Sequence, residues 1–136
     1  MRDDVLISLA REARKNSYSP YSGYPVGSAL LTEDGRTFSG TNVENASYGL
    51  SICAERNTIF SMVTAGRLRW SRIVVVTKDG SPPCGACLQV LAEFADRSGT
   101  SEVILVSESE IVARFKLKDL LPNGFELKGN RVDSNS

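Results

Sequence analysis

Two short apolar runs, separated by one helical segment, constrain the fold of this chain more than any other feature. Residues 73–76 and 103–106 are rich in β-branched side chains and have the composition of strands that are buried on both faces. Between them, a segment from about Cys84 to Ala95 is predicted to form a helix. Such a strand–helix–strand unit is expected to cross over with a right hand. The sequence therefore predicts an α/β protein with a layered architecture.

The remaining segments add a hairpin and further helices to this unit. Residues 3–15 form a predicted amphipathic helix, with Asp3 or Asp4 as its cap and with Val5, Leu6, Leu9, Ala10 and Ala13 on one face. Strands are predicted at 26–32 and 36–41, joined at an Asp-Gly turn, and at 112–115. Helices are predicted from about Cys53 to Ala65, stopped by Gly66, and as a short turn over 117–121. This order implies a mixed sheet with helices on its faces.

Length and charge restrict the domain organisation and the partners. The 136 residues are expected to form one domain over residues 1–129, followed by a polar, flexible tail over 130–136. Sixteen basic and sixteen acidic residues cancel, which disfavours a nucleic-acid partner. The apolar runs are too short for a membrane span, and the N-terminus lacks a signal-peptide pattern. We therefore predict a cytoplasmic protein.

All three cysteines of the chain fall into two motifs, and the chain has no histidine. The motifs are Cys53-Ala54-Glu55-Arg56 and Pro83-Cys84-Gly85-Ala86-Cys87. A structural zinc site usually closes with four Cys or His ligands, whereas a catalytic site uses three and keeps one position open for water. Three cysteines with a nearby Glu match the catalytic Zn²⁺ site. The alternative of three buried small hydrophobic residues leaves their clustering in two motifs unexplained.

Both motifs lie where a predicted helix begins. A helix N-terminus carries partial positive charge, which lowers thiol pKa values and favours the thiolate that binds metal. Cys84 and Cys87 are three residues apart and can face one point from a first helical turn. Cys53 and Glu55 would point about 200° apart in mid-helix, so we expect Cys53 at the cap position.

The residues beside Cys53 have several possible roles. Glu55 is expected to act as a general acid and base, although a fourth metal ligand or an ordinary first-turn Glu are alternatives. Zinc with three thiolates has a net negative charge, and the Arg56 guanidinium is the candidate that compensates it. A surface ion pair between Arg56 and Glu93 is the alternative. The Cys84–Cys87 pair alone would also suit a redox motif, but that interpretation leaves Cys53 and Glu55 unexplained.

Together the motifs resemble those of the cytidine deaminases, in the small form with three cysteine ligands. The resemblance covers about residues 18–125 and rests on both cysteine motifs and on the segments Tyr18-Ser19-Pro20-Tyr21-Ser22, Val26-Gly27-Ser28-Ala29-Leu30, Gly40-Thr41-Asn42-Val43-Glu44-Asn45-Ala46-Ser47-Tyr48 and Leu120-Leu121-Pro122. It implies a three-layer fold with about five strands and helices on both faces. It also implies zinc-dependent deamination of cytidine and deoxycytidine in pyrimidine salvage, by a homotetramer whose sites are shared between subunits.

The resemblance further implies the contacts of the substrate. Asn42 and Glu44 would hydrogen-bond the ribose hydroxyls, for which a carboxamide and a carboxylate are suited; turn and capping chemistry is the alternative. Tyr24, where the family often has Phe, would lie near the pyrimidine. The Ala54 backbone N–H would orient the ring, and Phe125 would reach a neighbouring subunit's site.

Two positions depart from the family pattern. Leu88 follows Cys87 where the family often has Arg, and Asn57-Thr58 follows Arg56 where small residues are common. These departures leave open a related substrate, such as a blasticidin-type cytosine nucleoside. An inactive zinc-stabilised scaffold is a further alternative, but a scaffold has no need of Glu55.

Overall fold

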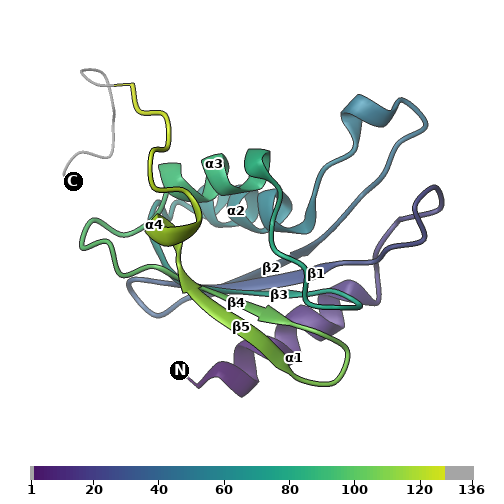
Figure 1. Ribbon diagram of the computed structural model, residues 1–136, viewed down its shortest axis with the longest axis horizontal. Helices are drawn as coiled ribbons and strands as arrows, with labels where there is room; N and C mark the ends of the chain where they lie inside the picture. Colours follow the sequence, from purple (N-terminus) through teal and green to yellow (C-terminus); the bar gives the residue numbers. More distant parts are fainter. Residues whose placement is uncertain (1, 128–136) are drawn as a thin grey trace.

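The computed structural model describes residues 2–127 and contains a five-stranded sheet in the order β2-β1-β3-β4-β5 (Figure 1). The strands are β1 (Gly27–Thr32), β2 (Thr37–Thr41), β3 (Trp70–Val76), β4 (Glu102–Val106) and β5 (Ile111–Lys116). The helices are α1 (Asp3–Arg14), α2 (Ala54–Thr64), α3 (Gly85–Glu93), α4 (Leu117–Leu120) and the short 3₁₀ helix η1 (Tyr48–Leu50). The tail predicted over 130–136 lies outside the described residues. Within residues 2–127, no helix has the length and apolarity needed to span a bilayer.

The sheet is mixed, as the sequence predicts. Strands β3 and β4 are parallel and are connected through α3, which confirms the strand–helix–strand unit. Strands β1 and β2 form the predicted antiparallel hairpin, whose turn places Gly35 at a φ of 87°, a conformation that favours glycine. Strand β1 also pairs antiparallel with β3, and β5 pairs antiparallel with β4. The hairpin and the parallel unit therefore share one sheet.

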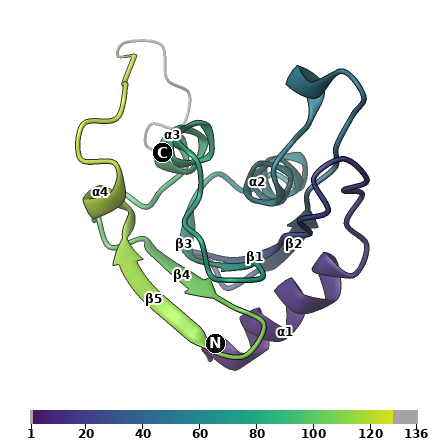
Figure 2. The ribbon, with the colours of Figure 1, turned by 45° about the vertical axis from the view of Figure 1, so that its right-hand side comes forward.

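Helices cover both faces of this sheet. Helices α2 and α3 lie side by side on one face, and α1 crosses the other (Figures 1 and 2). The central strands β1, β3 and β4 are buried because their apolar side chains meet a helix layer on each side. The predicted three-layer arrangement is thus confirmed, and it puts the N-termini of α2 and α3 on the same side of the sheet.

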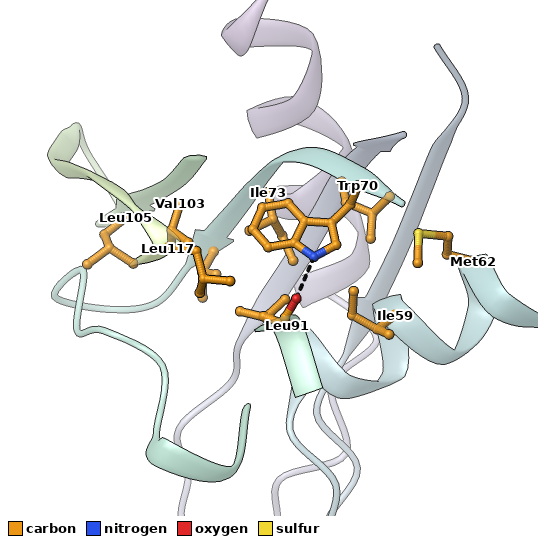
Figure 3. Packing of buried hydrophobic residues seen from close by; sticks show 10 residues of the cluster. Ile59, Met62, Trp70, Ile73, Leu91, Val103, Leu105 and Leu117 are labelled. Carbon is orange, nitrogen blue, oxygen red and sulfur yellow. Dashed lines mark hydrogen bonds between the residues drawn. The ribbon is translucent and has the colours of Figure 1, made fainter. Parts of the chain in front are cut away.

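Trp70 is the largest fully buried side chain and connects the sheet to α3 (Figure 3). Its indole Nε1 donates a 2.9 Å hydrogen bond to the backbone carbonyl of Leu91. Ser101 donates to the Trp70 carbonyl at 2.9 Å, so the residue is anchored from two sides. Strand β3 begins at Trp70, three residues before the predicted start, because this buried indole belongs to the core.

The start of the chain differs from the prediction in two details. Neither Asp3 nor Asp4 caps α1; the cap residue is Arg2, without a side-chain cap bond, and both acids lie in the first turn. Asp3 instead forms ion pairs with Arg72 of β3 and Arg114 of β5. Of the predicted apolar face, Leu6 and Ala10 are fully buried, whereas Val5 is 41% exposed, because the contact with the sheet is centred on Leu6 and Ala10.

Candidate metal centre

The three cysteines converge at the N-termini of α2 and α3. Cys53 is the N-cap of α2 and has an extended backbone, as its spacing from Glu55 requires. Cys84 is the N-cap of α3, and Cys87 lies in the first turn of the same helix. Their three sulfur atoms all lie within 4.8 Å of one another, an arrangement that could hold a metal ion. Neighbouring helices on one sheet face bring together residues that are 31 positions apart.

The sulfur cluster fits zinc in its geometry, and one of its sulfurs is already in the charge state that binds metal. A tetrahedral site with Zn–S bonds of about 2.3 Å separates its sulfurs by about 3.8 Å. The Cys84 and Cys87 sulfurs are 3.4 Å apart, so small side-chain adjustments suffice. A hydrogen bond from Cys87, with a smaller effect of Arg56, lowers the pKa of Cys53 to about 5. Cys53 is therefore a thiolate at neutral pH, the form that binds metal, while the same contact raises the pKa of the Cys87 thiol, which donates to it.

Arg56 lies against this cluster. Its Nη2 donates to the Cys53 sulfur at 3.5 Å, and this contact raises the pKa of the guanidinium above its ordinary value. Its Nε is buried and has no hydrogen-bond partner among the described residues. A half-buried cation thus faces the sulfurs, where it offsets the negative charge that three thiolates would give a divalent metal.

Glu55 is a buried acid in the first turn of α2. Only 5% of its surface is exposed, and this burial raises the pKa of its carboxyl to about 7, with a further contribution from the charge of Cys53. A carboxyl with a pKa near neutrality exchanges protons readily at physiological pH, which suits a general acid and base. The sulfur cluster itself is formed by the three cysteines without Glu55.

Asn42 and Glu44 lie beside the loop of residues 17–25 and bind it. The buried Asn42 side chain accepts hydrogen bonds from Ser17 at 2.6 Å and from the Val26 N–H at 3.0 Å. The Glu44 carboxylate accepts hydrogen bonds from the hydroxyl and the backbone N–H of Ser22, and these bonds lower the pKa of Glu44. Both side chains therefore have loop partners, the role that the turn and capping interpretation assigns them.

The other predicted substrate contacts come from three separate segments of the chain. Tyr24 lies in the same loop, and its carbonyl accepts a 3.0 Å bond from Asn42. Ala54 is fully buried and directly follows Cys53 at the start of α2. Phe125 is 72% exposed, and its backbone N–H and carbonyl are bound by the side-chain amide of Gln89 at 3.1 and 2.9 Å. The structure thus places Ala54 in the first cysteine motif, Tyr24 in the loop that Asn42 binds, and Phe125 on the surface.

Sequence reasoning missed three residues that hold these segments. Ser22 binds Glu44, Asp79 accepts a hydrogen bond from Tyr24, and Gln89 holds Phe125. The dipeptide Asp79-Gly80 signals a turn, but not the partner of the aspartate, which is 55 residues away. Leu88 packs partly buried against the main core cluster, so apolar packing fills the position where the family often has Arg.

Comparison with known proteins gives these features a context. The family model of the cytidine and deoxycytidylate deaminase zinc-binding region matches residues 1–105. A cytidine deaminase of Halalkalibacterium halodurans is 42% identical over 127 residues, covering 92% of this chain and 95% of the relative. One of Mycobacterium tuberculosis is 41% identical over 126 residues, covering 91% and 90%. The crystal structure of a cytidine deaminase from Burkholderia pseudomallei superimposes with a TM-score of 0.84 at 43% identity, covering 92% of this chain and all of the other. The chain belongs to the cytidine and deoxycytidylate deaminase family.

Proposed function

We propose that this protein catalyses the zinc-dependent hydrolytic deamination of cytidine and deoxycytidine to uridine and deoxyuridine, with release of ammonia. The observation that carries the proposal is the three-sulfur cluster with a buried, near-neutral carboxyl in the adjacent helical turn. Membership of the family and the names of relatives about 40% identical support the same reaction. The substrate class follows from these relatives, and the chemistry follows from the site.

Each residue of the site has its own role in the proposed reaction. Zinc, when held by Cys53, Cys84 and Cys87, supplies a Lewis acid that makes water a nucleophile at neutral pH. Glu55 takes a proton from the attacking water and delivers it to N3 of cytosine. After attack at C4, the same carboxylate takes the remaining proton of the new C4 hydroxyl and passes it to the amine, so that the C4–N4 bond breaks, the C4 carbonyl forms and ammonia leaves. Arg56 keeps the thiolates in place by donating to the Cys53 sulfur.

Substrate binding requires an exchange of partners at Glu44. Its carboxylate is bound by the Ser22 hydroxyl, and a ribose hydroxyl is chemically equivalent to that donor. We infer that the sugar takes the place of the Ser22 hydroxyl at Glu44 and receives a further bond from Asn42. The carboxylate would repel a 5′-phosphate, which favours a nucleoside over a nucleotide. The Ala54 N–H would orient the ring, and Tyr24 would stack on it.

A second copy of the chain is proposed to complete each site. The exposed Phe125 ring has a fixed backbone and would be contributed to a neighbour. A groove of about 550 Å³ beside α2 is lined in part by Val43 and Phe60. The η1 segment projects from the rest of the molecule (Figure 2), and its Leu50 side chain is exposed. These apolar surfaces suit a homotetramer, with D2 symmetry as the natural closed form. Light scattering should then give four times the 14.8 kDa chain mass, and a monomer would refute the assembly.

The cellular setting follows from the proposed reaction. We propose that residues 1–129 form the catalytic domain and that the protein acts in the cytoplasm in pyrimidine salvage.

The experiment that tests the function compares three substrates. Cytidine, deoxycytidine and blasticidin are each incubated with the zinc-loaded protein, and the loss of cytosine absorbance is followed. We expect rapid loss with the first two and little with the third. Turnover of blasticidin alone would reassign the substrate, and no turnover of any of them would leave only a zinc-stabilised scaffold.

A further inference from the structure

Every polar group of Tyr24 has a hydrogen-bond partner. Its backbone N–H donates to the Ser22 hydroxyl at 3.1 Å, and its carbonyl accepts from Asn42 at 3.0 Å. Its phenol hydroxyl donates to Oδ1 of Asp79 at 2.6 Å. The first two bonds fix the backbone and leave the ring free to rotate, so the bond to Asp79 is the one that fixes the ring.

Asp79 is itself held firmly. The same Oδ1 accepts from the Thr77 hydroxyl at 3.3 Å and from the N–H and hydroxyl of Ser81 at 3.2 and 2.7 Å. These donors, the Tyr24 hydroxyl first among them, lower the pKa of Asp79 to about 2. The carboxylate is therefore charged at neutral pH and points in one direction.

The turn that carries Asp79 is anchored to the sheet. The buried Thr77 hydroxyl accepts from the N–H groups of Gly80 and Ser81 at 2.7 and 3.1 Å, and the Thr77 N–H donates to the carbonyl of Val106 in β4. The turn connects β3 to Cys84, the first sulfur of α3. The Tyr24–Asp79 bond therefore joins the loop of residues 17–25 to the rigid segment that leads into the metal centre.

We propose that Asp79 is a positioning residue of the nucleoside site: it engages the Tyr24 hydroxyl, so that the ring is held in one orientation and offers its apolar face to the base. The inference rests on the proposed function. It explains how tyrosine can occupy a position where phenylalanine would suffice for stacking. The Asp79 carboxylate accepts the hydrogen bond of the phenol hydroxyl, which is the only donor of the side chain. A ring that is fixed before binding loses less rotational freedom when the base stacks on it.

A double-mutant cycle tests the pair. Tyr24→Phe keeps the ring and removes the donor, whereas Asp79→Ala removes the acceptor. Each variant is expected to raise KM for cytidine about three- to tenfold with kcat within about twofold. The KM of the double variant should be no higher than that of the more impaired single variant, because the Tyr24–Asp79 hydrogen bond is lost in all three. Asp79→Asn retains an acceptor oxygen and should lie closer to wild type than Asp79→Ala.

Controls separate this bond from a general structural effect. Asp119→Ala removes an exposed carboxylate from α4, away from the Tyr24–Asp79 pair, and should leave KM unchanged. Zinc content and circular dichroism are expected to match wild type in every variant. Calorimetric titration with uridine should show the same weakening as KM, without depending on turnover.

The outcomes distinguish this inference from the proposed function. Unchanged KM and uridine affinity in both single variants, or effects that multiply in the double variant, would overturn the role of Asp79 while cytidine turnover by the wild type stands. A wild-type protein that neither binds uridine nor deaminates cytidine would overturn both.

Discussion

Glu55 concentrates the chemistry of the proposed site in one side chain. It is almost completely buried, and burial raises the pKa of its carboxyl to about 7. A carboxyl with the ordinary pKa of 4.5 would be a poor acid for the departing amine at neutral pH. The first helical turn of α2 places this group beside Cys53, so one short motif supplies both a sulfur ligand and the proton carrier.

Glu55→Gln tests this assignment. The amide keeps the shape of the side chain but carries no proton to transfer, so kcat for cytidine should fall by about 10²–10⁴-fold. Zinc content should stay near that of the wild type, as measured by metal analysis. Glu12→Gln, on α1 and across the sheet from the site, is the matched control and should keep full activity. Near-normal turnover by Glu55→Gln would remove Glu55 as the proton carrier.

At the scale of single residues, the sequence alone identifies those functional residues that lie in short, recognisable motifs. The three cysteines and Glu55 are visible because each lies in a short motif at a helix start. Asp79 and Ser22 are not, because their roles depend on contacts with residues 55 and 22 positions away in the chain. The packing of two loops decides those contacts, and no periodicity or spacing in the sequence specifies it.

Among the elements, α1 depends on both ion pairs and close backbone packing. Asp3 in its first turn pairs with Arg72 and Arg114, which come from two different strands. Further along the helix, the carbonyl oxygen of Ala10 lies so close to Gly27 of β1 that a Cβ there would be 2.0 Å away. These contacts fix the helix on the face of the sheet opposite to the metal centre.

Asp3→Asn should weaken the attachment of α1 in a pH-dependent manner. In the folded state the pKa of Asp3 lies below its ordinary value of 3.8, chiefly because of the hydrogen bond from Arg114. The folded state therefore binds a proton at Asp3 less readily than the unfolded state does. The stabilisation is therefore complete above that unfolded value and is lost as pH falls through the folded value. We expect the variant to lose about 1 kcal/mol of unfolding free energy at neutral pH. Urea titrations should show the difference from wild type shrinking in acid.

Asp4→Asn is the matched control for this measurement. Among residues 2–127, the Asp4 carboxylate pairs with Arg2 alone, in an ion pair whose side chains are 65% and 82% exposed. Its removal should change stability little at any pH. An equal loss in the two variants would show that the dipole of the helix, rather than the pairs with the sheet, makes Asp3 stabilising.

Gly27→Ala tests the close packing of α1 on β1. The added Cβ meets backbone rather than a flexible side chain, so the helix must move away from the strand. Thermal and urea unfolding should report a loss of about 3 kcal/mol. Gly49→Ala, where an added Cβ meets nothing within 4 Å, should be nearly neutral. A stable Gly27→Ala protein would show that this contact is looser than described.

The periodicity of apolar residues predicts most helices and strands of the structure, but it predicts their first and last residues less accurately. Strand β3 begins at Trp70, before its β-branched run, because the indole is fixed by Leu91 of a helix that comes later in the chain. Helix η1 was missed within a segment predicted as loop, since its three residues have no apolar period. The cap of α1 was predicted wrongly because Asp3 has stronger partners in the sheet than in its own helix.

For the molecule as a whole, the sheet order explains how the site forms. The parallel unit of β3, α3 and β4 and the antiparallel hairpin of β1 and β2 join at the pairing of β1 with β3. This junction places α2 and α3 side by side (Figure 2). The N-termini of these two helices bring all three sulfurs within 4.8 Å of one another. Neither half of the chain holds the full set of cysteines, so the metal centre forms only when both halves have assembled into the sheet.

The central claim is that these sulfurs hold the zinc on which cytidine deamination depends. Zinc content and the loss of cytosine absorbance are measured on the purified protein, after chelation, and after Zn²⁺ is restored. We predict about one zinc per chain, loss of activity on chelation and recovery with added Zn²⁺. A zinc-free, fully folded protein that deaminates cytidine at the original rate would contradict the account.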